Sequence, residues 1–83
     1  MQKILIADEL SYCRQLFSFA LRKNGYDVVA AEDGLSAIDA NKKEKPDLVI
    51  LEAKLPKMDG LGVLRVIRSS PDYRQLPVFM LTA

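Results

Sequence analysis

Residues 45–60 read Lys45-Pro-Asp-Leu-Val-Ile-Leu-Glu-Ala-Lys-Leu-Pro-Lys-Met-Asp-Gly60. The Lys-Pro pair at the start closes a preceding helix, because proline does not continue one. Residues 47–51 then form a short, nearly continuous apolar run, which is typical of a strand covered on both faces. Glu52 follows directly. The stretch therefore predicts a buried strand with a carboxylate at its carboxyl end.

Three further apolar runs lie outside this stretch, over residues 3–7, 27–31 and 77–82. Segments with helical spacing separate the runs. These predicted helices run from Leu10 to the stop signal Asn24-Gly25, from Asp33-Gly34 to Lys45-Pro46, and through Leu61, Leu64 and Ile67 to the break at Ser69–Asp72. In the first of them we expect Cys13, Phe17 and Ala20 to face the core.

The predicted order of elements is β-α-β-α-β-α-β. Strands separated by helices of this length pair in parallel through right-handed crossovers. The predicted class is therefore a doubly wound α/β sheet. Ligands of such sheets bind beyond the carboxyl ends of the strands.

Composition excludes several classes of protein. The chain has 83 residues, of which 49% are hydrophobic and 28% charged, so it suits one folded domain rather than a disordered segment. A net charge of +1 gives no overall attraction to nucleic acid or membrane, and no apolar run is long enough for a membrane span. The chain has no histidine, so catalysis by histidine and metal sites with histidine ligands are excluded. The lone Cys13 fits a reducing, cytoplasmic location.

Polar residues follow three of the predicted strands. Asp8 and Glu9 follow the first strand, Glu52 follows the third, and Thr82 ends the fourth. If these strands are neighbours, the three carboxylates share one crevice, where like charges either raise the pKa values of the carboxyl groups or require a cation. Oxygen ligands suit Mg²⁺. Singly, each residue has a structural explanation, such as Glu9 stabilising the positive end of the next helix. Together they predict a hard-cation site able to receive a phosphoryl group.

The chain resembles the receiver domain of bacterial response regulators. The resemblance covers residues 1–83 without insertions, and its most specific parts are the Pro-x-Met-Asp-Gly loop and the Leu-Thr-Ala ending. The matching segments are Lys3–Glu9, Asn24–Gly34, Lys45–Leu51, Leu55–Gly60 and Leu76–Ala83. The resemblance implies a flavodoxin-like (CheY-like) fold and a role in two-component phosphorelay signalling, as a signalling module rather than an enzyme.

The resemblance also implies roles for single residues. Asp8 and Glu9 match the acidic pair that holds Mg²⁺, and Thr82 matches the hydroxyl that senses the phosphoryl group. Ala83 matches the small residue after it. The loop that shapes the site is matched by Pro56 and Gly60.

Glu52 departs from the family pattern, because it stands where the family has its phosphoacceptor aspartate. The extra methylene displaces the carboxylate by about 1 Å, an offset that can cost on the order of a hundredfold in phosphoryl transfer. The longer side chain would either reach toward Thr82 and imitate a phosphorylated aspartate or fill the site. Lys54 either neutralises Asp8, Glu9 or Glu52, which would make Mg²⁺ dispensable, or is a solvated loop lysine.

Length is the second departure. The family's last third, a fourth helix, fifth strand and fifth helix, is missing, so residues 1–83 form an incomplete receiver-like domain. The fourth strand becomes an open edge, and the first helix has a wide apolar face with Tyr12, Leu16 and Phe19. The chain is then a fragment, or it pairs with a copy of itself, or the remainder was lost.

Three functions follow from these observations. The first is a pseudo-receiver that takes phosphate poorly and acts through protein–protein contacts. The second is a phosphorylation-competent receiver that accepts phosphoryl from a histidine kinase on Glu52 or Asp8. The third is an assembly half-module that completes its sheet with another chain. The expected partners are a histidine kinase or another signalling protein, or a second copy through the fourth strand and first helix, with no direct contact to nucleic acid or membrane.

Overall fold

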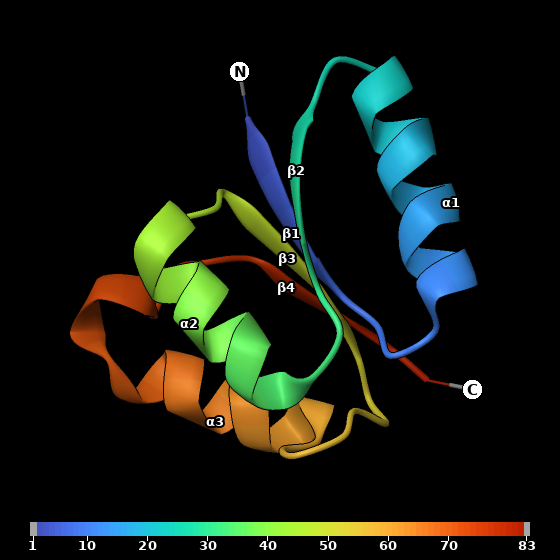
Figure 1. Ribbon diagram of the computed structural model, residues 1–83. Coiled ribbons are helices and arrows are strands. Elements are labelled where there is room, and N and C mark those ends of the chain that lie inside the picture. Colours follow the sequence, from blue (N-terminus) through green and yellow to red (C-terminus); the bar gives the residue numbers. More distant parts are fainter. Residues whose placement is uncertain (1, 83) are drawn as a thin grey trace.

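The computed structural model describes residues 2–82 of the chain. Its elements alternate between strand and helix, as the sequence predicts, with one additional 3₁₀ turn before the last strand (Figure 1). In chain order they are β1 (Lys3–Ala7), α1 (Ser11–Lys23), β2 (Asp27–Ala31), α2 (Gly34–Glu44), β3 (Leu48–Glu52), α3 (Gly60–Ser69), η1 (Pro71–Tyr73) and β4 (Val78–Leu81).

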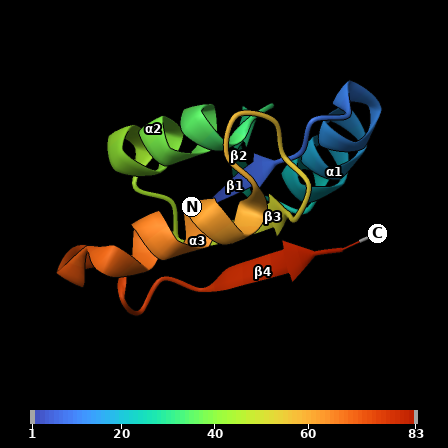
Figure 2. The ribbon, with the colours of Figure 1, turned by 90° about the horizontal axis from the view of Figure 1, so that it is seen from below.

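The strands form one parallel sheet in the order β2-β1-β3-β4. Helix α1 lies on one side of this sheet, and α2 and α3 lie together on the other (Figures 1 and 2). The predicted doubly wound α/β class is therefore confirmed. The order also makes β1, β3 and β4 neighbours, which is the condition for bringing their carboxyl ends together.

The main core lies between the sheet and the pair α2–α3. Leu5, Val49 and Leu51 point from the sheet into this layer, where they meet Val63 and Ile67 of α3. Side chains alternate between the two faces of a strand, so Ile4 and Ile6 point to the face on which α1 lies, and both are buried. Covering both faces explains why β1 is a continuous apolar run.

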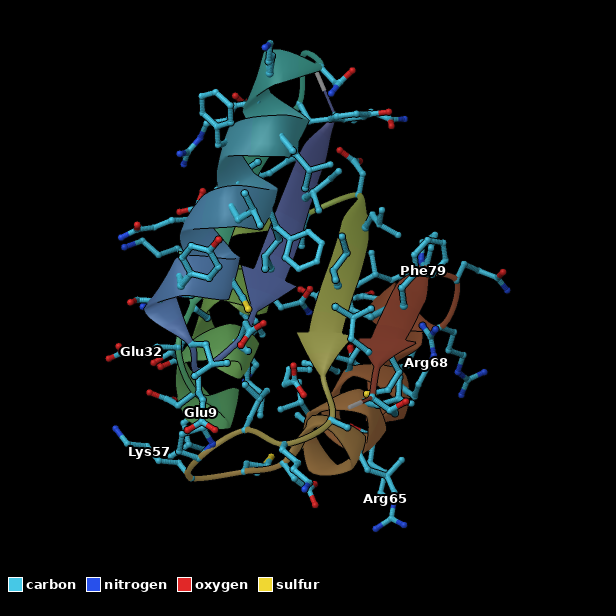
Figure 3. The ribbon with its side chains drawn as sticks, turned by 90° about the vertical axis from the view of Figure 1, so that its right-hand side faces the viewer. Glu9, Glu32, Lys57, Arg65, Arg68 and Phe79 are labelled. Atoms are coloured by element: carbon cyan, nitrogen blue, oxygen red, sulfur yellow. The ribbon has the colours of Figure 1, made fainter. Side chains whose placement is uncertain are left out.

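The prediction that Cys13, Phe17 and Ala20 of α1 face the core is wrong. Phe17 is 39% exposed, Ala20 is exposed and Cys13 is only half-buried, while Ser18 is the buried residue of this helix. The reason is the position of the helix, which packs against β1 and β2 and leaves the β3–β4 half of the face uncovered. Phe79 of β4 is 60% exposed there, and Figure 3 shows it at the open side of the sheet.

None of the helices within residues 2–82 is both long enough and apolar enough to cross a membrane.

Candidate functional site

The strand register gathers the predicted polar residues at one edge of the sheet. Ala7 is the register partner of Leu51, and Glu52 is the partner of Leu81. Asp8 therefore follows β1 directly beside Glu52, and Thr82 follows β4 one residue beyond the partner of Glu52. The structure thus brings Asp8, Glu52 and Thr82 to neighbouring strand ends.

Asp8 is held firmly at the end of β1. Asp8 is only 4% exposed. Its amide donates to the Ala31 carbonyl at 3.0 Å, and its Oδ1 accepts from the Leu10 amide at 3.0 Å. Arg14 of α1 reaches back and donates from Nη1 to the carbonyls of Asp8 at 2.7 Å and Glu9 at 3.1 Å. These bonds leave Oδ2 of Asp8 without a hydrogen-bond partner within residues 2–82, and therefore open to a ligand.

Glu9 lies outside this arrangement. It is exposed and lines a hollow of about 200 Å³ together with Glu32, Asp33, Pro56 and Lys57. Figure 3 shows Glu9, Glu32 and Lys57 near one another at this end of the molecule. Helix α1 begins at Ser11 with Leu10 as its N-cap, so Glu9 lies just before the helix rather than in its first turn.

Glu52 is the last residue of β3, one residue later than the predicted end of that strand. Its side chain is half-buried and forms no hydrogen bond or ion pair with the residues that the structure describes. The Ala53 amide donates to the Leu81 carbonyl at 2.8 Å, which fixes the end of β3 against β4. Thr82 is exposed, and Ala83 lies outside the described residues.

The lysines after β3 differ from each other. Lys54 is exposed and forms no ion pair within the described part of the chain. Lys57 instead lies 3.6 Å from Oδ2 of Asp33. Sequence reasoning placed Asp33 at the start of a predicted helix, where aspartate is a common N-cap, but it gave neither Asp33 nor Lys57 a role at the site.

Asp33 caps α2 and is almost fully buried. Its Oδ1 accepts from the Ser36 amide at 2.7 Å and its Oδ2 from the Ser36 hydroxyl at 3.0 Å. The hydrogen bond from the Ser36 amide is the largest cause of the lowered pKa of Asp33. Burial of the carboxyl raises this pKa, whereas the Ser36 hydroxyl and the positive charge of Lys57 lower it further. Asp33 is therefore held as a carboxylate.

The loop with the predicted residues Pro56 and Gly60 is folded against the site. The Pro56 carbonyl accepts from the Gly34 amide at 3.1 Å, and the Gly60 amide donates to the Ala53 carbonyl at 2.8 Å. A Cβ on Gly60 would collide with the backbone oxygen of Glu52. Only glycine allows this approach of α3 to the end of β3.

The carboxylates provide a small ligand set for a metal. Within residues 2–82 no three acidic or cysteine side chains are grouped closely enough to hold an ion, so Asp8, Glu9 and Glu52 do not act as one trio in this structure. Mg²⁺ usually takes only one or two carboxylates and completes its shell with waters. The free Oδ2 of Asp8 and the unpaired Glu52 fit that requirement.

Comparison with known proteins identifies the family. The family model described as "Response regulator receiver domain" matches residues 4–83. The chain belongs to the response regulator receiver domain family. Receiver domains are signalling modules.

Several relatives and solved structures are similar to this receiver. It is 45% identical over 82 residues to "Probable transcriptional regulator ycf27" of Galdieria sulphuraria and 39% identical over 82 residues to "Alkaline phosphatase synthesis transcriptional regulatory protein PhoP" of Bacillus subtilis, covering 99% of this chain in both cases. The chain spans 31% and 33% of their lengths.

Among solved structures, the N-terminal domain of a response regulator receiver protein from Methanoculleus marisnigri is 34% identical, with a TM-score of 0.94 over 100% of this chain and 68% of that one. The receiver domain of the sensor histidine kinase PA1611 from Pseudomonas aeruginosa is 29% identical, with a TM-score of 0.93 over 99% of this chain and 67% of that one. The latter has a magnesium ion coordinated in its active-site cleft.

Proposed function

We propose that this receiver is a pseudo-receiver, which accepts phosphoryl poorly and signals through protein–protein contacts. The observation that carries the proposal is Glu52, which ends β3 beside Asp8, at the position where the family has its phosphoacceptor aspartate. Its carboxylate forms no ion pair or hydrogen bond within residues 2–82. The partners are a histidine kinase or another signalling protein, and the site of action is cytoplasmic.

The chemical argument concerns the position of the attacking oxygen. Glutamate displaces its carboxylate by about 1 Å relative to aspartate. Phosphoryl transfer depends on in-line placement, and an offset of this size costs on the order of a hundredfold in rate. The backbone cannot absorb the difference, because the Ala53 amide and Gly60 hold the end of β3 from two sides.

Asp8 and Glu52 are the residues that would hold Mg²⁺ in this receiver. When bound, the ion would neutralise negative charge on an incoming phosphoryl group. Asp8 supports this role through its free Oδ2 and through the bond between its Oδ1 and the Leu10 amide, which orients the carboxylate. Lys54 forms no ion pair with a carboxylate of residues 2–82, so within the described part of the chain it does not replace the ion.

Two other functions rest on separate observations. A phosphorylation-competent receiver is favoured by Asp8 and Thr82, which accompany Glu52 at the same edge of the sheet. An assembly half-module is favoured by the open side of β4, where Phe79 is exposed. We rank both below the pseudo-receiver, because neither accounts for the glutamate.

Intact mass after incubation with acetyl phosphate and Mg²⁺ tests the proposal. The samples are the parent chain, Glu52→Asp, and Glu52→Gln as a control without a carboxylate, each first shown to be folded by circular dichroism. We expect a phosphoryl adduct on Glu52→Asp only. An adduct on the parent that Glu52→Gln abolishes would establish the phosphorylation-competent function instead. If Glu52→Asp also gains nothing, the glutamate is not what silences the site and the proposal fails.

A further inference from the structure

A groove separates the outer side of α1 from the edge of the sheet at β2. It has a volume of about 800 Å³, within the range of typical ligand pockets. Its lining comes from one side of the helix and from one strand residue: Arg14, Gln15, Ser18, Phe19, Arg22, Lys23 and Ala30. Figure 1 shows α1 beside β2. Of the lining residues, only Arg14 contacts the strand-end site, through the backbone carbonyls of Asp8 and Glu9.

The side chains that line the groove give it a positive charge. Arg14, Arg22 and Lys23 line it, and none of the lining residues within the described part of the chain carries a carboxylate. The whole chain has a net charge of only +1, so the groove concentrates cations that are elsewhere balanced. Arg14 has one ion-pair partner within residues 2–82, the carboxylate of Glu32, which lies 3.9 Å away on a side chain that is 71% exposed. Arg22 and Lys23 form no ion pair within residues 2–82, so they are available to an anionic ligand.

The groove also has an apolar wall. Phe19 is 66% exposed, and the ammonium of Lys23 lies 5.8 Å from the centre of its ring. A cation held near an aromatic face leaves the rest of the ring for apolar contact. A ligand that carries both acidic and apolar groups therefore fits better than a simple ion.

The backbone of β2 adds a third kind of contact. The Asp27 amide donates to Gln2 and the Ala31 carbonyl accepts from Asp8, so residues 27, 29 and 31 pair with β1. Backbone groups alternate in direction along a strand, and those of Val28 and Ala30 therefore face outward. Arg22 confirms this direction, because its Nη2 donates to the Val28 carbonyl at 3.3 Å. The amide and carbonyl of Ala30, which have no hydrogen-bond partner within residues 2–82, lie at the groove.

We propose that this groove binds an acidic, extended segment of a partner protein. The segment adds beside β2 through the outward backbone groups of Ala30, places carboxylates on Arg22 and Lys23, and rests apolar side chains on Phe19. Exposed strand edges recognise peptides in this way, with backbone bonds for affinity and side chains for specificity. Nothing in this proposal depends on Glu52 or on phosphorylation.

The test measures the binding of a short fluorescein-labelled peptide in which glutamate and valine alternate, by fluorescence anisotropy at low salt. The double variant Arg22→Gln/Lys23→Gln removes the free cations. The matched control is Lys42→Gln/Lys43→Gln, which removes the same charge from the last turn of α2. We expect the first pair to weaken binding about threefold to tenfold, and the control to change it less than about twofold.

A second readout locates the peptide. In amide spectra of the ¹⁵N-labelled chain, saturating peptide should shift the signals of Val28, Ala30 and Lys23. Equal losses of affinity in both double variants, shifts confined to β4, or no binding at all would each overturn the proposal. Tighter binding of a single-stranded oligonucleotide than of the peptide, lost in the Arg22→Gln/Lys23→Gln variant, would also overturn it and reassign the groove to nucleic acid.

Discussion

Asp33 and Lys57 form an ion pair, with 3.6 Å between Oδ2 and Nζ, that joins the start of α2 to the loop after β3. The pair acts together with the hydrogen bond from the Gly34 amide to the Pro56 carbonyl. Lys57 adopts a positive φ of 70°, which the loop requires at this point. The loop beside the strand-end site is thus attached to α2 by both charge and backbone.

The ion pair predicts a change in the pKa of Asp33. Lys57→Met should raise the pKa of Asp33 only part of the way back to its ordinary value, because the hydrogen bond from the Ser36 amide is the larger cause of the lowered pKa. Lys54→Met, which removes another exposed lysine with no ion-pair partner among residues 2–82, should leave the pKa of Asp33 unchanged. Titration of the Asp33 carboxyl by NMR measures both. Equal shifts in the two variants would contradict a specific pair.

The lowered pKa of Asp33 also predicts how stability depends on pH. The ordinary pKa is 3.8 and the folded one is lower, so at acidic pH the unfolded chain binds more protons than the folded chain. This contribution is complete above the unfolded value and is lost as pH falls through the folded one. Melting temperatures across this range should fall more steeply in the parent than in Asp33→Asn. Parallel curves would show that Asp33 contributes nothing.

The loop geometry predicts different effects at two glycines of α3. Gly60→Ala should lower the free energy of unfolding by about 1–3 kcal/mol, because its Cβ meets the Glu52 backbone oxygen. At Gly62 the Cβ would approach the flexible Met58 side chain at 2.8 Å, and the gain in helix propensity offsets this contact. Gly62→Ala should therefore stay within about 0.5 kcal/mol of the parent. Urea denaturation measures both values, and similar losses would refute the close approach at Gly60.

The uncovered half of the sheet predicts self-association through β4. In sedimentation experiments, the average mass of the parent chain should rise with protein concentration. Phe79→Glu should reduce this rise, because it places a charge on the open face of the sheet. The control is Leu35→Glu, at a side chain of α2 that is 48% exposed and lies on the other side of the sheet. A parent chain that remains monomeric throughout the concentration series would exclude this association.

The strand-end site illustrates how far sequence reasoning extends. Parallel strands end at the same edge, so the positions of Asp8, Glu52 and Thr82 at the ends of three apolar runs are enough to predict that they come together. The different environment of Glu9 could not be predicted, because it depends on where the loop with Pro56 and Lys57 folds. The pairing of Lys57 rather than Lys54 has the same origin.

By itself, the sequence determined the order of elements, the parallel sheet and the edge that carries the polar residues. These features follow from short-range patterns, since apolar runs, helical spacing and stop signals act on neighbouring residues. Only the tertiary structure decided that α1 covers β1 and β2, leaving Phe17 and Phe79 partly exposed and a basic groove beside Ala30. An apolar stripe shows that a helix can bury a face, but which face is buried depends on where the helix packs across the sheet.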